Sequence, residues 1–152
     1  MRTSLVDGRV AIVRYGEVWR RLAETVGNAT LFMWPAIIDA WQQELAQGVS
    51  AEVLLVHCGS RLVGILPLMR ATVLRGPAFV PRIDYAPYDR DLAPPSLRPF
   101  PVRQVSSMVS WRATSLRPTL LCAPDDRASV IMAVAAALAD MRGVDQIVLP
   151  VP

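Results

Sequence analysis

The stretch Glu52–Met69, EVLLVHCGSRLVGILPLM, decides the fold. Glu52–Cys58 is rich in Val and Leu, Gly59-Ser60 is typical of a two-residue turn, and Arg61–Met69 has the composition of a returning strand. Both arms are almost continuously apolar, which is typical of strands buried on two faces. The stretch therefore predicts a central hairpin covered by helices on both sides, in an α/β or α+β fold. Pro67 has no N–H to donate, so we expect the second arm to bend or end there.

The chain on either side of this hairpin supplies helices and further strands. Arg9–Arg14 has the pattern of a first strand, Gly16–Val26 that of a helix, and Pro35–Gln47 that of a second helix with proline in its first turn. After the hairpin, a helix is predicted over Arg127–Arg142 and a last strand over Asp145–Leu149. The buried face predicted for the third helix is Val130, Ile131, Val134, Leu138 and Met141.

The segment between the hairpin and the third helix is harder to assign. Ala71–Val80 suggests one more strand, broken by Gly76-Pro77, and Arg82–Pro101 is a long Pro-rich segment expected to be irregular. Val102–Trp111 fits either a short helix or an edge strand, and Ser115–Cys122 fits a strand. The element order predicts one domain over residues 1–152, built on a mixed central sheet flanked by helices.

Composition narrows the class of protein. Of 152 residues, 53% are hydrophobic, yet no run reaches the ~18 apolar residues of a membrane span, and the N-terminus lacks the apolar core of a signal peptide. We therefore expect a cytoplasmic protein without a membrane span. The net charge of +3 comes from arginines scattered among acids, which argues against nucleic acid as a partner. Cys58 and Cys122 are expected to be buried free thiols, and their spacing from the single His predicts no metal site.

Three pieces of the sequence resemble one family. Ala29–Ala36 with Ala40-Trp41 resembles the "atpF-x-spaWl-x-aW" motif of CelD/BcsL-type proteins, which are GNAT-fold acyltransferases of cellulose and exopolysaccharide biosynthesis. Arg61–Leu68 is similar to the "lvGllPL" strand of that family, and Ile83–Asp89 is similar to its "sDY-x-dpl" box. The pieces follow the family order over about Val10 to Pro150, although Trp34 precedes Pro35 and Ile83 replaces Ser.

This resemblance implies a GNAT-like domain that corresponds to the N-terminal half of a tandem protein. It implies acetyl-CoA or another acyl-CoA as donor, bound mainly by the second half. A GNAT donor site needs a Gly-rich turn whose N–H groups hold the pyrophosphate at a helix N-terminus. The nearest candidate, Arg75–Ala78, has one Gly, and Pro77 removes a donor. We therefore expect no cofactor to be bound by this chain, and we expect the chain alone to be inactive.

Candidate site residues cluster in one place. Asp84, Tyr85, Tyr88 and Asp89 form a dense polar and aromatic group, in which Asp84 or Tyr85 could act as general base and Tyr85, Tyr88 and Asp89 could bind an acceptor. The simpler interpretation is that they are turn residues that cap and cover the core edge. Trp34 could stack on a sugar but is more simply a core residue. His57, inside an apolar strand, is best interpreted as a hydrogen-bonded core histidine.

Two functions fit these observations. The chain could be the acceptor-binding half of an acyltransferase of polysaccharide or cell-envelope biosynthesis, or a non-catalytic GNAT-like module that pairs with another subunit. An exposed apolar helix face or sheet edge would favour the second function. Because the chain is so apolar, we expect it to self-associate or to bind a second GNAT-like half, with Asp145–Leu149 contributing to the contact.

Overall fold

The computed structural model describes residues 1–26, 29, 33–45, 48–75, 100–107 and 120–149. The elements along these residues are β1 (Arg2–Asp7), α1 (Gly8–Thr25), α2 (Pro35–Glu44), β2 (Val49–Cys58), β3 (Arg61–Arg75), β4 (Phe100–Ser107), β5 (Leu121–Cys122), a 3₁₀ turn (Pro124–Asp126), α3 (Arg127–Ala139) and β6 (Gln146–Val148).

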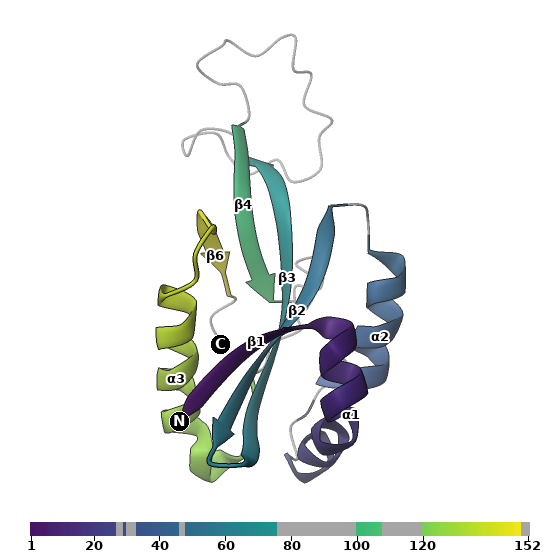
Figure 1. Cartoon of the computed structure of the whole chain (residues 1–152), viewed down its shortest axis with the longest axis vertical. Coiled ribbons are helices and arrows are strands. Elements are labelled where there is room, and N and C mark those ends of the chain that lie inside the picture. Colours follow the sequence, from purple (N-terminus) through teal and green to yellow (C-terminus); the bar gives the residue numbers. More distant parts are fainter. Residues whose placement is uncertain (27–28, 30–32, 46–47, 76–99, 108–119, 150–152) are drawn as a thin grey trace.

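The strands form one mixed sheet with the predicted hairpin at its centre (Figure 1). The order is β1-β2-β3-β4-β6. The short β5 also pairs with β3, at an earlier stretch of that strand than β4 does. Every neighbouring pair is antiparallel except β4 and β6, which are parallel, and the chain between them contains α3. The α+β class and the mixed sheet flanked by helices are therefore confirmed.

The hairpin closes through a glycine and carries a bulge. Gly59 has a φ of +61°, and it precedes Ser60, which has no positive φ, a pattern that suits a type II′ turn. Leu62 lies opposite His57 while Gly64 lies opposite Val56, so Val63 is an extra residue in β3. A bulge of this kind directs neighbouring side chains of β3 to new faces of the sheet.

Of the two alternatives predicted at Pro67, a bend or an end of the second arm, the end is wrong, because β3 runs through this proline to Arg75. On one side Pro67 lies opposite Val53 of β2. On the other side, the described partner changes from β5, opposite Gly64 and Ile65, to β4, whose pairing begins opposite Leu68. Pro67 falls at this changeover, where its missing N–H removes none of the described pairings.

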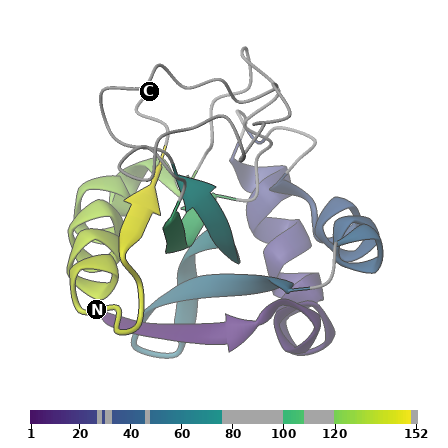
Figure 2. The same cartoon turned by 90° about the horizontal axis from the view of Figure 1, so that it is seen from above.

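The hairpin has helices on both faces, with α1 and α2 on one side and α3 on the other (Figure 2). A separate core layer lies on each face. Residues alternate between the layers along β2, so that Leu55 faces α1 and α2 whereas Leu54 faces α3. Trp19 anchors the first layer, since it is fully buried and its indole N–H donates a 2.7 Å hydrogen bond to the Met33 carbonyl. The second layer is closed by three buried residues of α3: Val130, Val134 and Leu138.

The prediction of a strand over Arg9–Arg14 is wrong. These residues lie in α1, and β1 precedes them and pairs with β2 at the edge of the sheet. The cause is Asp7, whose carboxylate accepts hydrogen bonds from the backbone N–H groups of Arg9 (2.9 Å) and Val10 (3.2 Å). This side-chain cap starts the helix eight residues before the predicted position at Gly16.

Other boundaries differ by less. The Val102–Trp111 alternative is resolved in favour of a strand as far as Ser107, and β4 also includes Phe100 and Pro101, which were expected to be irregular. Residues 82–99 and most of the strand predicted over Ser115–Cys122 lie outside the described residues. Helix α3 ends at Ala139, three residues before its predicted end.

Two burial predictions are corrected. Ile131 is 45% exposed instead of buried, because it lies beside the stripe that faces the sheet. Cys58 is exposed at the end of β2, next to the hairpin turn, whereas Cys122 is buried as predicted. Burial raises the pKa of the Cys122 thiol, so this side chain behaves as an apolar core group.

Candidate functional site

The predicted acceptor-binding residues are only partly described by the structure. Asp84, Tyr85, Tyr88 and Asp89 lie outside the described residues, and their roles stay predictions. Trp34 is the N-cap residue of α2, where it is half-buried and packs against the core layer beneath α1 and α2. This position is that of a core-edge residue, and stacking on a sugar stays a prediction.

His57 lies in the core layer on the α1 side of the sheet. Its side chain is buried, with its ring 5.9 Å from the ring of Tyr15 and tilted by 60°. Burial and the nearby charge of Arg2 both lower the pKa of His57, which favours the neutral imidazole. Among the described groups, the buried Nδ1 has no hydrogen-bond partner, so hydrogen bonding of the ring stays a prediction. A neutral ring packed against Tyr15 fits a packing role.

Two acids at the sheet, Glu52 and Asp145, are each held by an arginine. Glu52 and Arg70 form a half-buried ion pair on the α3 side, with Nε–Oε1 at 3.0 Å and Nη2–Oε2 at 3.1 Å. Asp145 is held by Arg103 through two side-chain hydrogen bonds of 3.0 and 2.7 Å and a backbone one of 2.9 Å. These bonds lower the pKa of Asp145 to about 2. A carboxylate with so low a pKa is a poor general base at neutral pH.

The start of α3 has acidic groups where an anion site would need a positive potential. Pro124, Asp125 and Asp126 form the turn that precedes the helix. The carboxylate of Asp126 accepts hydrogen bonds from Arg61 Nη2 at 3.1 and 3.3 Å, and Asp125 is exposed. These carboxylates oppose a bound phosphate, and Pro124 contributes no N–H. The turn therefore does not fit a pyrophosphate.

The most unusual surface of the described residues is the solvent side of α3. The helix contains no charged residue between Arg127 and Asp140. Its exposed apolar residues, which we call the α3 outer face, are Ala128, Ile131, Met132, Ala135, Ala136 and Ala139. Met132 is 71% exposed. A helix that is apolar on all sides is normally buried on all sides, so this face has the composition of a contact surface.

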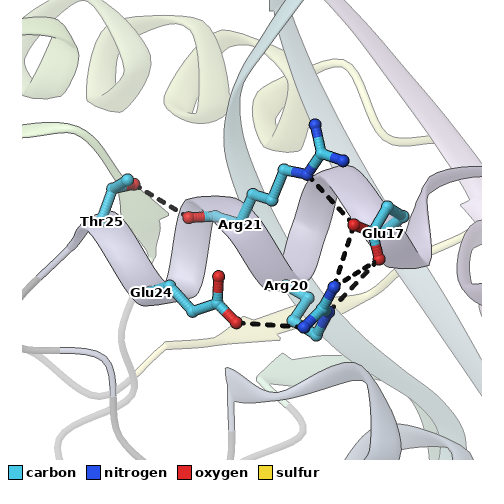
Figure 3. A network of polar contacts seen from close by, with 5 residues as sticks. All are labelled: Glu17, Arg20, Arg21, Glu24 and Thr25. Carbon is cyan, nitrogen blue, oxygen red and sulfur yellow. Dashed lines mark hydrogen bonds and ion pairs between the residues drawn. The ribbon is translucent and has the colours of Figure 1, made fainter.

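The solvent side of α1 shows what a water-facing helix looks like in the same chain (Figure 3). Glu17 bonds Arg20 at 2.8 Å and Arg21 at 3.1 Å, and Arg20 also bonds Glu24 at 3.3 Å. These pairs are spaced three or four residues apart along one helix face. The outer side of α1 therefore carries paired charges beside its exposed valines, whereas the α3 outer face carries no charge.

The α3 outer face was not found from the sequence, because Ile131 was assigned to the buried side. A usable signal was nevertheless present, since twelve uncharged residues separate Arg127 from Asp140. A water-facing helix of that length normally places charges on its outer side.

The described residues contain neither a metal site nor a membrane-spanning helix, and comparison of the chain with known proteins finds no match. The described residues contain no group of His, Cys, Asp and Glu that could hold a metal ion. No helix among them is long and apolar enough to cross a bilayer. Comparison of the whole chain with family models, with curated proteins and with solved structures finds no match.

Proposed function

We propose that this chain is a non-catalytic GNAT-like module that works by binding another polypeptide through the α3 outer face. The observation that carries the proposal is the contrast between two helices of one sheet: the outer side of α1 has a network of ion pairs, and that of α3 has no charge. Exposed apolar faces of this kind mark sites of protein–protein contact.

The order of elements supports the GNAT-like part of the proposal. A strand, two helices, the central hairpin and β4 are followed by α3 and by β6, which lies parallel to β4. The resemblance to CelD/BcsL-type proteins implies a mixed central sheet flanked by helices, and this order of elements builds such a sheet. An acyltransferase half that contributes acceptor binding in polysaccharide or cell-envelope biosynthesis has the same order, and its acceptor residues would be those of the Asp84–Asp89 segment.

The start of α3 supports the non-catalytic part. In a GNAT domain, the acyl donor's pyrophosphate is held by N–H groups at the start of a helix that follows a central strand. Here α3 follows β5, and Pro124, Asp125 and Asp126 occupy that turn. Because carboxylates repel a pyrophosphate, an acyl-CoA site at this position is disfavoured.

Calorimetric titration of the purified chain with acetyl-CoA tests this proposal. We expect no saturable heat up to millimolar donor, because the helix start repels the pyrophosphate. Desulfo-coenzyme A is the matched control ligand, because it has the same pyrophosphate and lacks the thiol. Saturable binding at low micromolar concentration by either ligand would show that the chain carries a donor site, and the non-catalytic proposal would then fail.

A further inference from the structure

We propose that protonation of His57 releases the Arg2 end of β1 from the edge of the sheet, so that this strand opens in mildly acidic solution. The two residues are paired directly across from each other, Arg2 in β1 and His57 in β2. The release of β1 goes beyond the proposed function, since it does not involve the α3 outer face.

The ring of His57 lies in a buried position that disfavours a positive charge. The residue is 7% exposed, and its Nδ1 has no hydrogen-bond partner among the described residues. The ring of Tyr15 from α1 lies 5.9 Å away, and Leu62 of β3 lies opposite His57 in the hairpin. Protonation adds a second N–H donor to the imidazole, and a buried N–H without an acceptor costs free energy. The closed position therefore favours the neutral ring.

The charged groups around His57 do not compensate for protonation. Burial lowers the pKa of His57, and the charge of Arg2 lowers this pKa further. From β3, Arg61 is a second positive group near the hairpin turn, and it is bound to Asp126 in the turn before α3. From α1, Tyr15 presents an uncharged phenol ring. A protonated His57 would therefore stand beside Arg2 without a described carboxylate to offset the two charges.

Strand β1 is the element that yields at the lowest cost. It lies at the edge of the sheet (Figure 2), and its described pairing is with β2. None of its six residues is fully buried, whereas Val53–His57 of β2 are buried without interruption. Its Asp7 end is fixed by the cap of α1, so the Arg2 end is the one that opens. Local opening is easiest where a segment buries little apolar surface of its own.

The pH window follows from the direction of the pKa shift. In the closed strand the pKa of His57 is lowered from its ordinary value of 6.5, and in the open strand contact with water restores that value. The open form therefore binds a proton more tightly. Closure is fully stable above pH 6.5 and weakens as the pH falls below it. Binding of one proton shifts the equilibrium towards opening by at most about 25-fold between pH 7 and pH 5.

Amide hydrogen exchange of the full chain, followed by NMR, tests the proposal. After correction for the intrinsic pH dependence of exchange, protection of the β1 amides that pair with β2 should fall about 5–25-fold from pH 7 to pH 5. Protection of the amides shared by β3 and β4 should change by less than about twofold. His57 is the only histidine of the chain, so no other imidazole titrates in this window.

Three variants separate the charge of His57 from its packing. His57→Gln keeps a polar side chain and removes the proton site, so protection of β1 should be the same at pH 7 and pH 5. Arg2→Gln removes the positive neighbour, so its loss of protection should be smaller than that of the parent. Arg9→Gln is the matched control, because this exposed arginine lies at the Asp7 end, and it should respond as the parent does. Far-ultraviolet circular dichroism at pH 7 checks that each variant is folded.

Each outcome decides for or against the release of β1. Equal protection of β1 at the two pH values, or an equal loss in the parent and in His57→Gln, would overturn the proposal. A loss shared equally by β1 and the β3–β4 pairing would show acid unfolding of the whole sheet, and the local release would then be refuted. The titration with acetyl-CoA is independent of these results, so the proposed function stands or falls separately.

Discussion

At the scale of single residues, Gly64 decides how closely α3 approaches the sheet. A Cβ built at Gly64 would lie 2.5 Å from Val130 Cγ1 and 3.2 Å from Val56 Cβ. The bulge at Val63 turns this position towards α3, and the absence of a side chain lets Val130 pack directly on the backbone. The contact between α3 and the sheet therefore depends on one missing methyl group.

Gly64→Ala should lower the free energy of unfolding by about 1–3 kcal/mol, because the added methyl overpacks the contact with Val130. Denaturant unfolding measures the change, and adding Val130→Ala should recover part of it. Gly16→Ala is the control, since its Cβ meets only Ile12 Cγ2 at 4.0 Å and it lies inside α1. That substitution should stabilise the protein by about 0.5–1 kcal/mol. Equal tolerance of the two alanines would refute this account of Gly64.

At the scale of elements, Arg103 and Asp145 fix β6 beside β4. Asp145 accepts from the Arg103 backbone and guanidinium, and its own N–H donates to the Arg103 carbonyl at 2.8 Å. This reciprocal contact stands one residue before the parallel pairing of Gln104 with Gln146. It sets the register of a strand that is only three residues long.

The Arg103–Asp145 contact should make stability depend on pH in a defined window. The folded pKa of Asp145 is lowered from 3.8 to about 2, so its contribution is present above pH 3.8 and is lost as the pH falls towards 2. Asp145→Asn should therefore lower the unfolding temperature at pH 7 and narrow its gap to the parent below pH 3. Thermal scans from pH 2 to pH 7 measure both curves.

Glu24→Gln supplies the control for these scans. It removes an exposed carboxylate from an ion pair within α1, and such pairs contribute little to stability. Its curve should follow that of the parent at every pH. A constant gap between Asp145→Asn and the parent down to pH 2 would show that the charge of Asp145 is unimportant.

At the scale of the whole molecule, stability rests on a sheet with two filled faces. Leu54 belongs to the α3 layer and Ile65 to the α1–α2 layer, and they are 2% and 0% exposed. Both lie in the central hairpin, so each layer depends on the same pair of strands. Loss of packing on either face should therefore destabilise the whole fold.

Leu54→Ala and Ile65→Ala should each cost about 2–5 kcal/mol of unfolding free energy, the usual range for a large-to-small core substitution. Chemical denaturation monitored by tryptophan fluorescence measures the loss. Val13→Ala, at an exposed position of α1, should change stability by less than about 0.5 kcal/mol. A small loss at only one of the two core sites would indicate that the corresponding face is poorly packed.

What the sequence determined by itself is the central hairpin, its turn and the helices that cover it. Continuous apolar strands require cover on both faces, Gly59 supplies the turn, and Pro35 starts α2 at its predicted residue. Val130, Val134 and Leu138 were likewise identified, because helical spacing alone predicts a buried stripe. These features depend on local patterns, which the sequence contains in full.

Only the tertiary structure decided where β1 ends, how β3 passes Pro67 and which side of α3 faces water. The apolar pattern of Arg9–Arg14 suits a strand as well as a helix, and the carboxylate cap of Asp7 selects the helix. Pro67 is accommodated because β3 changes partners there, and that follows from the sheet topology. The α3 outer face has the same apolar composition as the buried face, so only packing against the sheet distinguishes Ile131 from Val130.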